Sequence, residues 1–348
     1  MGAREQVGGH VKRLRTALIG YGMSGQTFHA PMIAATPELD LAWIVTGDPT
    51  RANLAQHRYP GSRVVSKVED LFDKESPDLA VVATPNGAHA TIALTAIAHG
   101  CGIVIDKPMA VTAEDGHALV EAARSHSVML TVFQNRRWDS DHLTLRQLIA
   151  DGTLGEIWRY DARYEFYRPG PGPATTNGLL LGLATHTIDQ AIELFGPVST
   201  VYGEVFTHVG DRDDDSFVAI AHENGVRSHF SQSSRSQRFG PRLRVVASLA
   251  TFEVDKVDAQ QCYLERNGAL PAPGTQTEPE SNHPLLVRNN MTIKVAAEPG
   301  QWFSFYPRVA RAVIDHSPPP VDPASAVYVL EVIEAARRSS ETKTVVAL

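Results

Sequence analysis

A lysine follows directly after one of the most apolar runs of the chain. Lys107, within Asp106-Lys107-Pro108, comes immediately after Cys101-Gly102-Ile103-Val104-Ile105. Such a run is typical of a buried strand in a parallel sheet, and open sheets of this kind bind ligands at the carboxyl ends of their strands. An amine at that position can exchange a proton with a bound ligand. We therefore expect Lys107 to take part in chemistry, although a lysine after a strand is most often simply solvated.

Glycine spacing predicts a dinucleotide site near the N-terminus. Gly20-Tyr21-Gly22-Met23-Ser24-Gly25 ends an apolar strand and opens a helical segment, which is the setting of the G-x-G-x-x-G fingerprint. Glycines let the backbone approach a pyrophosphate, whose charge is favoured at a helix N-terminus. We expect these six residues to bind NAD or NADP, and a purely structural turn is the alternative. A nicotinamide ring near Lys107 would lower the lysine pKa, so that Lys107 can remove the hydroxyl proton of an alcohol as hydride leaves.

The end of the second predicted strand bears on which cofactor is used. A carboxylate that holds the adenosine ribose normally stands there. This chain instead has Thr46-Gly47-Asp48, in which Gly47 occupies the expected position, Asp48 follows it by one residue and Arg51 is close by. An arginine without a competing carboxylate suits the 2′-phosphate of NADP. We therefore favour NADP over NAD, with Thr46, Gly47, Asp48 and Arg51 at the cofactor. The alternative for Asp48 is that it simply begins a turn with Pro49.

A second loop at the same sheet edge is expected to line the cofactor. Thr84-Pro85-Asn86 follows a predicted strand, with His89 one helical turn further on. Pro85 can stiffen the exit from the strand and Asn86 can cap the next helix, which is a complete structural explanation. Because of where the loop lies, we nevertheless assign Thr84, Pro85, Asn86 and His89 to the cofactor site, together with Asp106, Lys107 and Pro108.

A histidine and an aspartate stand at the start of a helical segment in the second half of the chain. His186 and Asp189 precede the apolar helical residues from Ala191 to Leu194. A spacing of three places both side chains on one helix face, where the carboxylate can orient the imidazole. We expect His186 to be catalytic with Lys107 and both His186 and Asp189 to contact the substrate. A histidine that only caps the helix is the alternative.

Polar, cationic and aromatic residues follow the last strand of the first half, in Gln134-Asn135-Arg136-Arg137-Trp138-Asp139. These side chains can hold a polyhydroxylated substrate or form an ion-pair network between domains, and the two interpretations have equal weight. We place Gln134, Arg136 and Trp138 at the substrate. Asn177 joins them from the Pro-, Gly- and Thr-rich segment Pro169 to Gly178, which is expected to be a mobile loop that can act as a lid.

The first third of the chain alternates short β-rich runs with helical segments, as repeated βαβ units do. Helix starts are expected at Ser66 and Thr112. Strands are predicted over 16–20, 41–46, 78–84, 102–106 and 129–134, and helices over 91–99 and 112–125. The pattern predicts an α/β Rossmann domain, a doubly wound parallel sheet, over residues 1–135, with residues 1–14 as a flexible leader.

After a helix over 138–151, longer runs with partial alternation indicate an antiparallel sheet. These runs are 156–167, 198–208, 216–222, 226–231 and 242–254, and Asn224-Gly225 predicts a two-residue hairpin turn. A loop is expected over 271–283 and helices over 303–314 and 324–338. Residues 136–348 are thus expected to form an α+β domain for substrate binding and oligomerisation, with a large, mostly antiparallel, open-faced sheet. Its last helix can pack back on the first domain.

Composition excludes several classes of protein. The 348 residues are 43% hydrophobic, with a net charge of −7 and a pI near 6.0, so we expect no nucleic-acid partner. No apolar stretch approaches the roughly 20 residues that span a bilayer, so we expect no membrane association and a cytoplasmic location. The distant Cys101 and Cys262 predict no disulfide, and no histidine or cysteine spacing indicates a metal.

Together these motifs resemble the glucose–fructose oxidoreductase, inositol dehydrogenase and rhizopine-catabolism (Gfo/Idh/MocA) family of NAD(P)-dependent sugar oxidoreductases. The resemblance covers nearly the whole chain, and the Asn-Arg-Arg-Trp-Asp run is most similar to the branch with NADP-dependent scyllo-inositol dehydrogenase. It implies a polyol or sugar substrate between two domains, proton transfer by Lys107 and His186, and a homodimer or homotetramer formed through the open sheet. It rests on Ile19 to Gly22, Thr27 to Pro31, Thr84 to Asn86 with His89, Val104 to Pro108, Asn135 to Asp141 and His186 to Gln190.

Three departures from the family pattern matter. Gly182 stands where the motif D-x-x-x-H has its aspartate, four residues before His186. Gln134 replaces a histidine of the branch, and the loop from Arg168 to Gly178 is shorter than expected. Two alternatives therefore stay open beside a sugar dehydrogenase. One is a catalytically impaired nucleotide-binding sensor or regulatory protein, and the other is an enzyme that accepts a non-sugar carbonyl.

Overall fold

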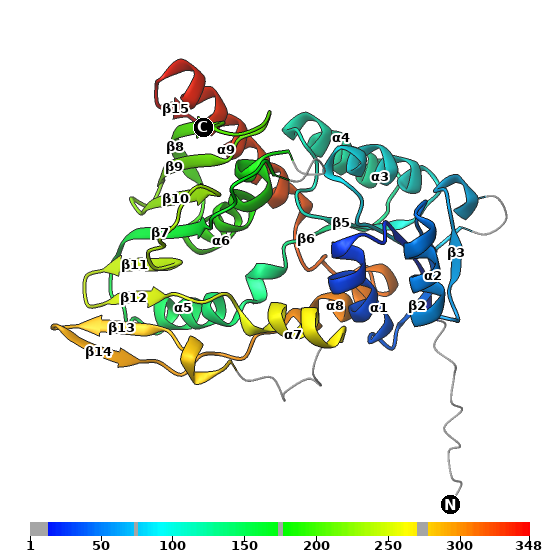
Figure 1. The fold of residues 1–348 in the computed structure, drawn as a ribbon, viewed down its shortest axis with the longest axis horizontal. Coiled ribbons are helices and arrows are strands. Elements are labelled where there is room, and N and C mark those ends of the chain that lie inside the picture. Colours follow the sequence, from blue (N-terminus) through cyan, green and yellow to red (C-terminus); the bar gives the residue numbers. More distant parts are fainter. Residues whose placement is uncertain (1–12, 73–75, 173–176, 270–277) are drawn as a thin grey trace, which may run out of the picture.

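The first half of the chain forms a six-stranded parallel sheet (Figure 1). The computed structural model describes residues 13–72, 76–172, 177–269 and 278–348. The strand order is β3-β2-β1-β4-β5-β6, which is the order of a doubly wound nucleotide-binding fold, so the predicted Rossmann sheet is confirmed. The strands are β1 (Leu14–Ile19), β2 (Leu39–Val45), β3 (Arg63–Val65), β4 (Leu79–Val82), β5 (Gly102–Asp106) and β6 (Leu130–Phe133).

Helices cover both faces of this sheet, which is why its strands read as continuous apolar runs. In β4, Leu79 and Val81 pack in one core cluster and Ala80 and Val82 in the other. The covering elements are the π-helical turn η1 (Gly25–His29), α1 (Ala30–Ala34), α2 (Pro49–Arg58), the 3-10 turns η2 (Glu69–Leu71) and η3 (Asn86–Ala88), α3 (His89–Ala98) and α4 (Ala113–Ser125).

Several predicted boundaries in this half are wrong. Leu14 begins β1 and does not belong to a flexible leader, while residues 1–12 of that leader lie outside the described residues. Thr112 caps α4 as predicted, because its side chain accepts a hydrogen bond from the Asp115 amide. Ser66, in contrast, starts no helix, since the short turn η2 follows only after Val68.

The second half of the chain forms a nine-stranded sheet in the order β14-β13-β12-β11-β7-β10-β9-β8-β15. Among the described strands of this sheet, only β7 and β10 pair in parallel, so the predicted mostly antiparallel sheet is confirmed. In β9, buried residues alternate with more exposed ones, and one face of this strand stays accessible. The strands are β7 (Ile157–Glu165), β8 (Val198–Phe206), β9 (Asp215–His222), β10 (Arg227–Ser233), β11 (Leu243–Ala247), β12 (Thr251–Val254), β13 (Leu285–Arg288), β14 (Met291–Lys294) and β15 (Val346–Ala347).

Two expectations for this sheet are wrong. The run 242–254 is not one strand but the hairpin of β11 and β12. The Asn224-Gly225 hairpin is also longer than a two-residue turn, because Glu223 to Val226 separate β9 from β10. Only residues 278–283 of the loop expected over 271–283 are described, and 280–282 there form the 3-10 turn η6 (Glu280–Asn282).

Two helices near the end of the chain connect the halves. In α8, Val309 and Ala310 share a core with Leu18 and Val81 of the first sheet. The last helix, α9, contacts α4 on one side and β8 on the other. The remaining elements are the 3-10 turn η4 (Asn135–Trp138), α5 (Ser140–Ala150), the π-helical turn η5 (Leu180–Ala184), α6 (Thr185–Phe195), α7 (Ala259–Asn267), the 3-10 turn η7 (Trp302–Ser304), α8 (Phe305–Ile314) and α9 (Pro323–Thr342).

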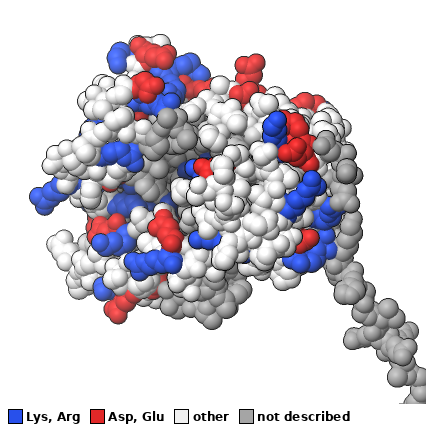
Figure 2. Space-filling model, turned by 45° about the vertical axis from the view of Figure 1, so that its right-hand side comes forward, with Lys and Arg blue, Asp and Glu red and all other residues white. Residues whose placement is uncertain are grey.

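Charged side chains of both signs lie interspersed over the face shown in Figure 2. Within the described ranges, the longest helix is α9, with 20 residues, and it carries several charged side chains. No helix among these residues is long and apolar enough to cross a membrane.

Candidate active site

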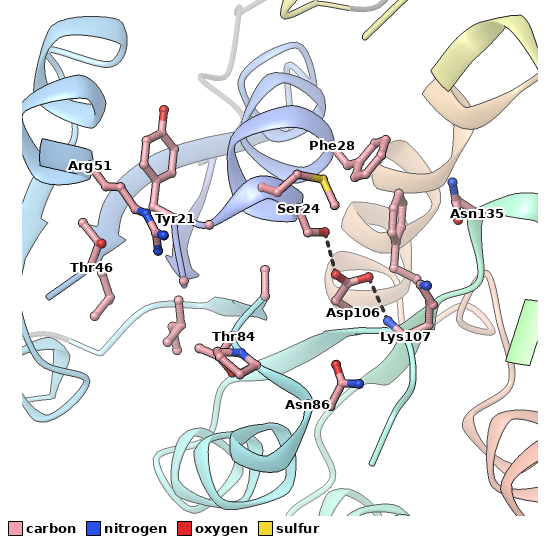
Figure 3. Close-up of a pocket in the computed structure, with 18 of the residues that line it drawn as sticks. Tyr21, Ser24, Phe28, Thr46, Arg51, Thr84, Asn86, Asp106, Lys107 and Asn135 are labelled. Carbon is pink, nitrogen blue, oxygen red and sulfur yellow. Dashed lines mark hydrogen bonds between the residues drawn. The ribbon is translucent and has the colours of Figure 1, made fainter. Parts of the chain in front are cut away.

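A cavity of about 830 Å³ runs along the carboxyl ends of the first sheet. Thr46 and Arg51 lie at one end and Asn135 at the other, with Ser24, Asp106 and Lys107 between them (Figure 3). Its lining brings together most of the predicted cofactor residues, namely Gly20, Tyr21, Gly22, Met23, Ser24, Thr46, Gly47, Arg51, Thr84, Pro85, Asn86, Asp106 and Lys107.

The glycine turn has the shape that a pyrophosphate requires. Gly20 has φ +102°, and a Cβ there would lie 2.4 Å from the Ala83 carbonyl oxygen. A Cβ on Gly25 would lie 2.2 Å from the Gly20 oxygen, so neither position tolerates a side chain. Apart from its two chain neighbours, the only described atom within 4 Å of a Cβ on Gly22 is Arg51 Nη1, at 3.9 Å. The turn therefore leaves its backbone open to the cavity before η1, and these residues fit a dinucleotide.

The cavity end near β2 carries two cations and one carboxylate. Arg51 lines it together with Ser66, Lys67 and Glu69, which follow β3 and were not predicted from the sequence. The structure corrects the prediction that Asp48 lies at the cofactor, because Asp48 does not line the cavity. Its carboxylate instead accepts a 2.9 Å hydrogen bond from the Arg51 amide and caps α2, which is the structural alternative that the sequence left open.

The structure also corrects the prediction that His89 lines the cofactor site. The ring is buried and lies outside the cavity lining, although Thr84, Pro85 and Asn86 line it. Its Nδ1 lies 2.8 Å from the Pro108 carbonyl oxygen and its Nε2 lies 2.8 Å from the Thr84 oxygen. His89 therefore joins two loops that border the site and holds them in place.

Lys107 is held by a backbone carbonyl from the second half of the chain. Its Nζ donates a 2.9 Å hydrogen bond to the Gly182 oxygen. Burial is the main cause that lowers the Lys107 pKa, and Arg136 lowers it further while Asp106 opposes the shift, which leaves the pKa at about 8. A lysine with this pKa exists in both protonation states near neutral pH.

Asp106 ties Lys107 to the glycine turn. Its carboxylate accepts hydrogen bonds from Ser24 Oγ at 2.5 Å and from the Lys107 amide at 2.8 Å (Figure 3). Burial raises the Asp106 pKa, but the His29 ring 3.8 Å away, the nearby Lys107 ammonium and the hydrogen bond from Ser24 outweigh it, so the net pKa lies below its ordinary value. Asp106 is thus a fixed anion between the dinucleotide turn and the lysine.

His186 lines the same cavity and is buried. Burial is the largest cause that lowers its pKa well below the ordinary value, and the positive charges of Lys107 and Arg136 act in the same direction. The imidazole is therefore neutral at physiological pH. Its Nδ1 is buried without a hydrogen-bond partner in the part of the chain that the structure describes, and a buried unpaired nitrogen inside a cavity is suited to a ligand.

Asp189 does not orient His186, which corrects the sequence-based prediction. Both of its oxygens accept hydrogen bonds from Arg137, at 2.8 Å from Nε and 2.6 Å from Nη2. The same helix face carries both residues, but the guanidinium from η4 competes for the carboxylate and takes it. His186 also follows Thr185, the first residue of α6, so it is not the capping residue of that helix.

The remaining substrate-site predictions divide. Arg136 lines the cavity, so its contact with the substrate stays a prediction, and it also pairs with Asp139 at 3.0 Å within the same segment. The structure corrects the placement of Gln134 and Trp138 at the substrate, because both are buried and line neither of the two cavities. Trp138 packs its ring edge against Phe305. Asn177 also lines neither cavity.

A second cavity of about 350 Å³ adjoins the first at Lys107. The two cavities share Met23, Asn86, Lys107 and Leu183. Gly182 lines the second cavity, and a Cβ added there would meet no atom of the described residues within 4 Å. Its other lining residues come mostly from the second half of the chain and combine apolar and charged groups, namely Pro108, Phe166, Arg168, Pro171, Gly172, Gly178, Leu179, Val209, Asp211, Arg212, Asp213, Asp214 and Ser234.

Further lining residues were not predicted from the sequence, among them Phe28, Tyr164, Gln261, Glu265 and Trp302. Phe28 stands inside the Thr27 to Pro31 motif, and Tyr164 lies within the strand predicted over 156–167, so position gave a signal for these two. Gln261 and Glu265 lie on α7, and the signal there was Asp258, which caps this helix.

The chain matches known families over both halves. Residues 14–134 match the model described as "Oxidoreductase family, NAD-binding Rossmann fold", and residues 142–253 match that of the "GFO/IDH/MocA C-terminal domain". An uncharacterized oxidoreductase, YdgJ, from Escherichia coli (strain K12) is 32% identical over 96% of this chain and 99% of its own.

Two further relatives cover almost the same length. The scyllo-inositol 2-dehydrogenase (NADP(+)) IolW from Bacillus subtilis (strain 168) is 29% identical over 97% of either chain. Among solved structures, the oxidoreductase yvaA from Bacillus subtilis superposes with a TM-score of 0.90 at 28% identity, covering 97% of this chain and 99% of that one. The similarity therefore extends through both sheets.

Proposed function

Because the chain belongs to the Gfo/Idh/MocA family of NAD(P)-dependent oxidoreductases, we propose that it transfers a hydride between NADP and a secondary alcohol. The substrate class is a cyclic polyol, a sugar or a sugar derivative. The observation that carries the proposal is the position of Lys107, which lines both the glycine-turn cavity and the second cavity. A scyllo-inositol 2-dehydrogenase among the relatives supports the substrate class.

When bound, the nicotinamide supplies a hydride acceptor or donor. The residues of this chain then have to manage the proton of the hydroxyl. Lys107, with a pKa of about 8, can take that proton as a neutral amine or return it as an ammonium. The neutral His186 ring, buried beside it, can hold or pass on the same proton. Asp106 keeps Lys107 at the junction of the two cavities.

NADP is the cofactor that the cavity supports better. Gly47 brings no carboxylate to the end of β2, and the carboxylate of Asp48 is used to cap α2. Arg51 and Lys67 supply two cations to the lining there, against the one carboxylate of Glu69, and an adenosine 2′-phosphate would be bound at these cations. The NADP-dependent relative IolW agrees with this choice.

A sensor or regulatory protein without turnover is the second candidate. Gly182 favours it, because the family aspartate is missing next to the lysine. Against it, Lys107 has a hydrogen-bond partner of another kind, the Gly182 carbonyl oxygen.

We also propose that the protein is a homodimer or homotetramer assembled through the accessible face of the second sheet. Phe217 on β9 and Phe206 on β8 are exposed large apolar side chains of two neighbouring strands. Arg159 and His229 both pair with Asp161 nearby, at 3.0 Å each. Apolar residues among paired charges are suited to a wet, self-complementary interface.

Cofactor titration followed by a substrate panel tests the function. NADP and NAD are titrated separately against the wild-type protein by fluorescence. Inositols, aldoses and a set of non-sugar ketones are then assayed at the nicotinamide absorbance. We expect tighter binding of NADP and turnover of at least one polyol or sugar. Tight binding with no turnover across the panel would instead favour the sensor, and turnover of the ketones alone would favour a non-sugar substrate.

The Lys107→Ala variant separates binding from chemistry. We expect it to bind NADP as the wild type does and to lose turnover by about 10²- to 10⁴-fold, the usual contribution of a general acid or base. Full turnover in this variant would remove Lys107 from the catalytic role.

A further inference from the structure

Helix α7 belongs to the second half of the chain but packs on the dinucleotide half. Asp258 caps it by accepting a hydrogen bond from the Gln260 amide at 2.7 Å. Leu264 is buried in the same core cluster as Tyr21 and Ala30 of the first half. Gln260 Oε1 accepts from the Trp302 amide at 2.8 Å. The buried side of α7 is therefore fixed, and the helix lies close to η1, which follows the glycine turn.

The next residues present polar groups to the cavity. Gln261 and Glu265, one helical turn apart, both line the 830 Å³ cavity. Gln261 Nε2 donates to Glu265 Oε1 at 3.0 Å. Gln261 Oε1 accepts from Arg136 Nη2 at 2.7 Å, and Arg136 Nη1 donates to Asp139 at 3.0 Å. A continuous chain of hydrogen bonds therefore runs from the domain junction to the dinucleotide cavity.

We propose that α7 is a clasp on the cofactor, in which Gln261 and Glu265 bind the hydroxyl groups of the ribose next to the nicotinamide. The inference rests on the proposed function because it needs a nicotinamide dinucleotide in the cavity. The glycine turn is suited to the pyrophosphate, while Lys107 and His186 mark the reacting end. The ribose on the nicotinamide side lies between these two points.

The chemistry of the two side chains fits a vicinal diol. A carboxylate is an acceptor with about four lone-pair sites, and an amide both donates and accepts, so together they can pair with two hydroxyls. Hydrogen bonds from hydroxyls to a carboxylate are charge-assisted and strong. A phosphate is a poor alternative partner, since it would face the negative charge of Glu265. The Arg136 bond to Gln261 also joins the clasp to a residue of the candidate substrate site.

The experiment measures cofactor release. Gln261→Ala, Glu265→Ala and Glu265→Gln are compared with the wild type for the NADPH dissociation constant and off-rate, read by fluorescence. Tyr263→Ala is the matched control, because Tyr263 is exposed on the same helix and lines neither cavity. Alanine keeps helix propensity at each position. We expect about a 10-fold weaker NADPH affinity for Gln261→Ala and Glu265→Ala, mostly through a faster off-rate, and no change for Tyr263→Ala.

Hydrogen exchange gives a second readout that does not depend on turnover. NADPH should slow exchange of the α7 amides in the wild type and slow it less in Glu265→Ala. Unchanged affinity and exchange in these variants, with NADPH bound normally by the wild type, would overturn the clasp and leave the proposed function intact. Tighter binding by Glu265→Gln would also overturn it, since the carboxylate would then face a phosphate. Absence of NADPH binding to the wild type would contradict the proposed function itself.

Discussion

The Lys107 ammonium donates a hydrogen bond of 2.9 Å to the backbone carbonyl oxygen of Gly182. A carbonyl oxygen fixes the lysine in place but brings no full negative charge, so it stabilises the ammonium less than a carboxylate does. Burial and the Arg136 charge can then lower the Lys107 pKa to about 8 despite the neighbouring Asp106. With no carboxylate side chain at Gly182, burial therefore remains the main cause that sets the Lys107 pKa.

The first prediction concerns pH. Alcohol oxidation needs the neutral amine of Lys107, so its kcat/KM should rise as the pH passes through about 8. Ketone reduction needs the ammonium and should decline over the same range. Initial rates in both directions between pH 6 and 10, at saturating cofactor, measure the two profiles. A profile that is flat near pH 8 in both directions would show that another group carries the proton.

Replacing Gly182 by aspartate should move that pH step upward. Within the part of the chain that the structure describes, a Cβ at Gly182 meets no atom within 4 Å, so we expect the side chain to be accommodated beside Lys107. An opposite charge within about 4–6 Å typically shifts a pKa by 1–3 units toward the charged form. We expect the oxidation profile of Gly182→Asp to rise at higher pH than that of the wild type. Gly182→Asn is the control, because it has the same shape without the charge and should keep the step near pH 8.

The third prediction concerns cofactor choice. Arg51→Ala removes one of the two cations at the cavity end near β2. NADP should then bind about 10- to 100-fold more weakly, while NAD binding changes little. The reason is that a charged hydrogen bond is lost only for the phosphorylated cofactor. Calorimetric titration with both cofactors gives the ratio. Arg311→Ala, at an exposed position of α8, is the control for net charge. Equal losses for NADP and NAD would contradict a 2′-phosphate at Arg51.

Asp189→Asn should act on stability rather than on chemistry. It leaves the guanidinium of Arg137 buried beside a neutral amide, and breaking a buried pair from one side costs about 3–5 kcal/mol. Urea denaturation should reveal this loss. The exposed pair of Arg124 with Glu121 is the comparison, because Glu121→Gln should leave the midpoint unchanged. If Asp189→Asn kept its stability and lost turnover, the aspartate would have to act on His186 after all.

Much of the fold could be predicted because each half has a clear apolar pattern. The strands around Val81 and Val104 are continuous apolar runs, and these runs also indicated where their carboxyl ends meet. The elements that were missed lack such a signal. Strand β3 has only three residues, beginning at Arg63, and the turn between β11 and β12 contains neither glycine nor proline. The β13–β14 hairpin was predictable in principle, because asparagine is favoured at the positive φ that a two-residue turn requires. Asn289 and Asn290, which join the two strands, have φ +50° and +61°.

The candidate site was predictable where a residue follows a strand directly, and less so where its partner comes from elsewhere. Lys107 and Thr84 line the cavity because the sheet itself places them there. Sequence spacing identified the helix face that Asp189 shares with His186, but it could not show that Arg137 binds the carboxylate. The same limit applies to His89, whose two partners are backbone carbonyl oxygens that carry no signal in the sequence. The roles of all these residues stay predictions.

Helix α8 has a consequence for how the protein is made. His29 Nδ1 lies 2.6 Å from the Tyr306 hydroxyl, although the two residues are 277 positions apart. The ribosome completes the glycine turn long before Tyr306 is synthesised, so the part of the first sheet's apolar face that α8 covers stays exposed during most of translation. The half of the protein that is made first is therefore complete only after α8, near the end of the chain, has been synthesised.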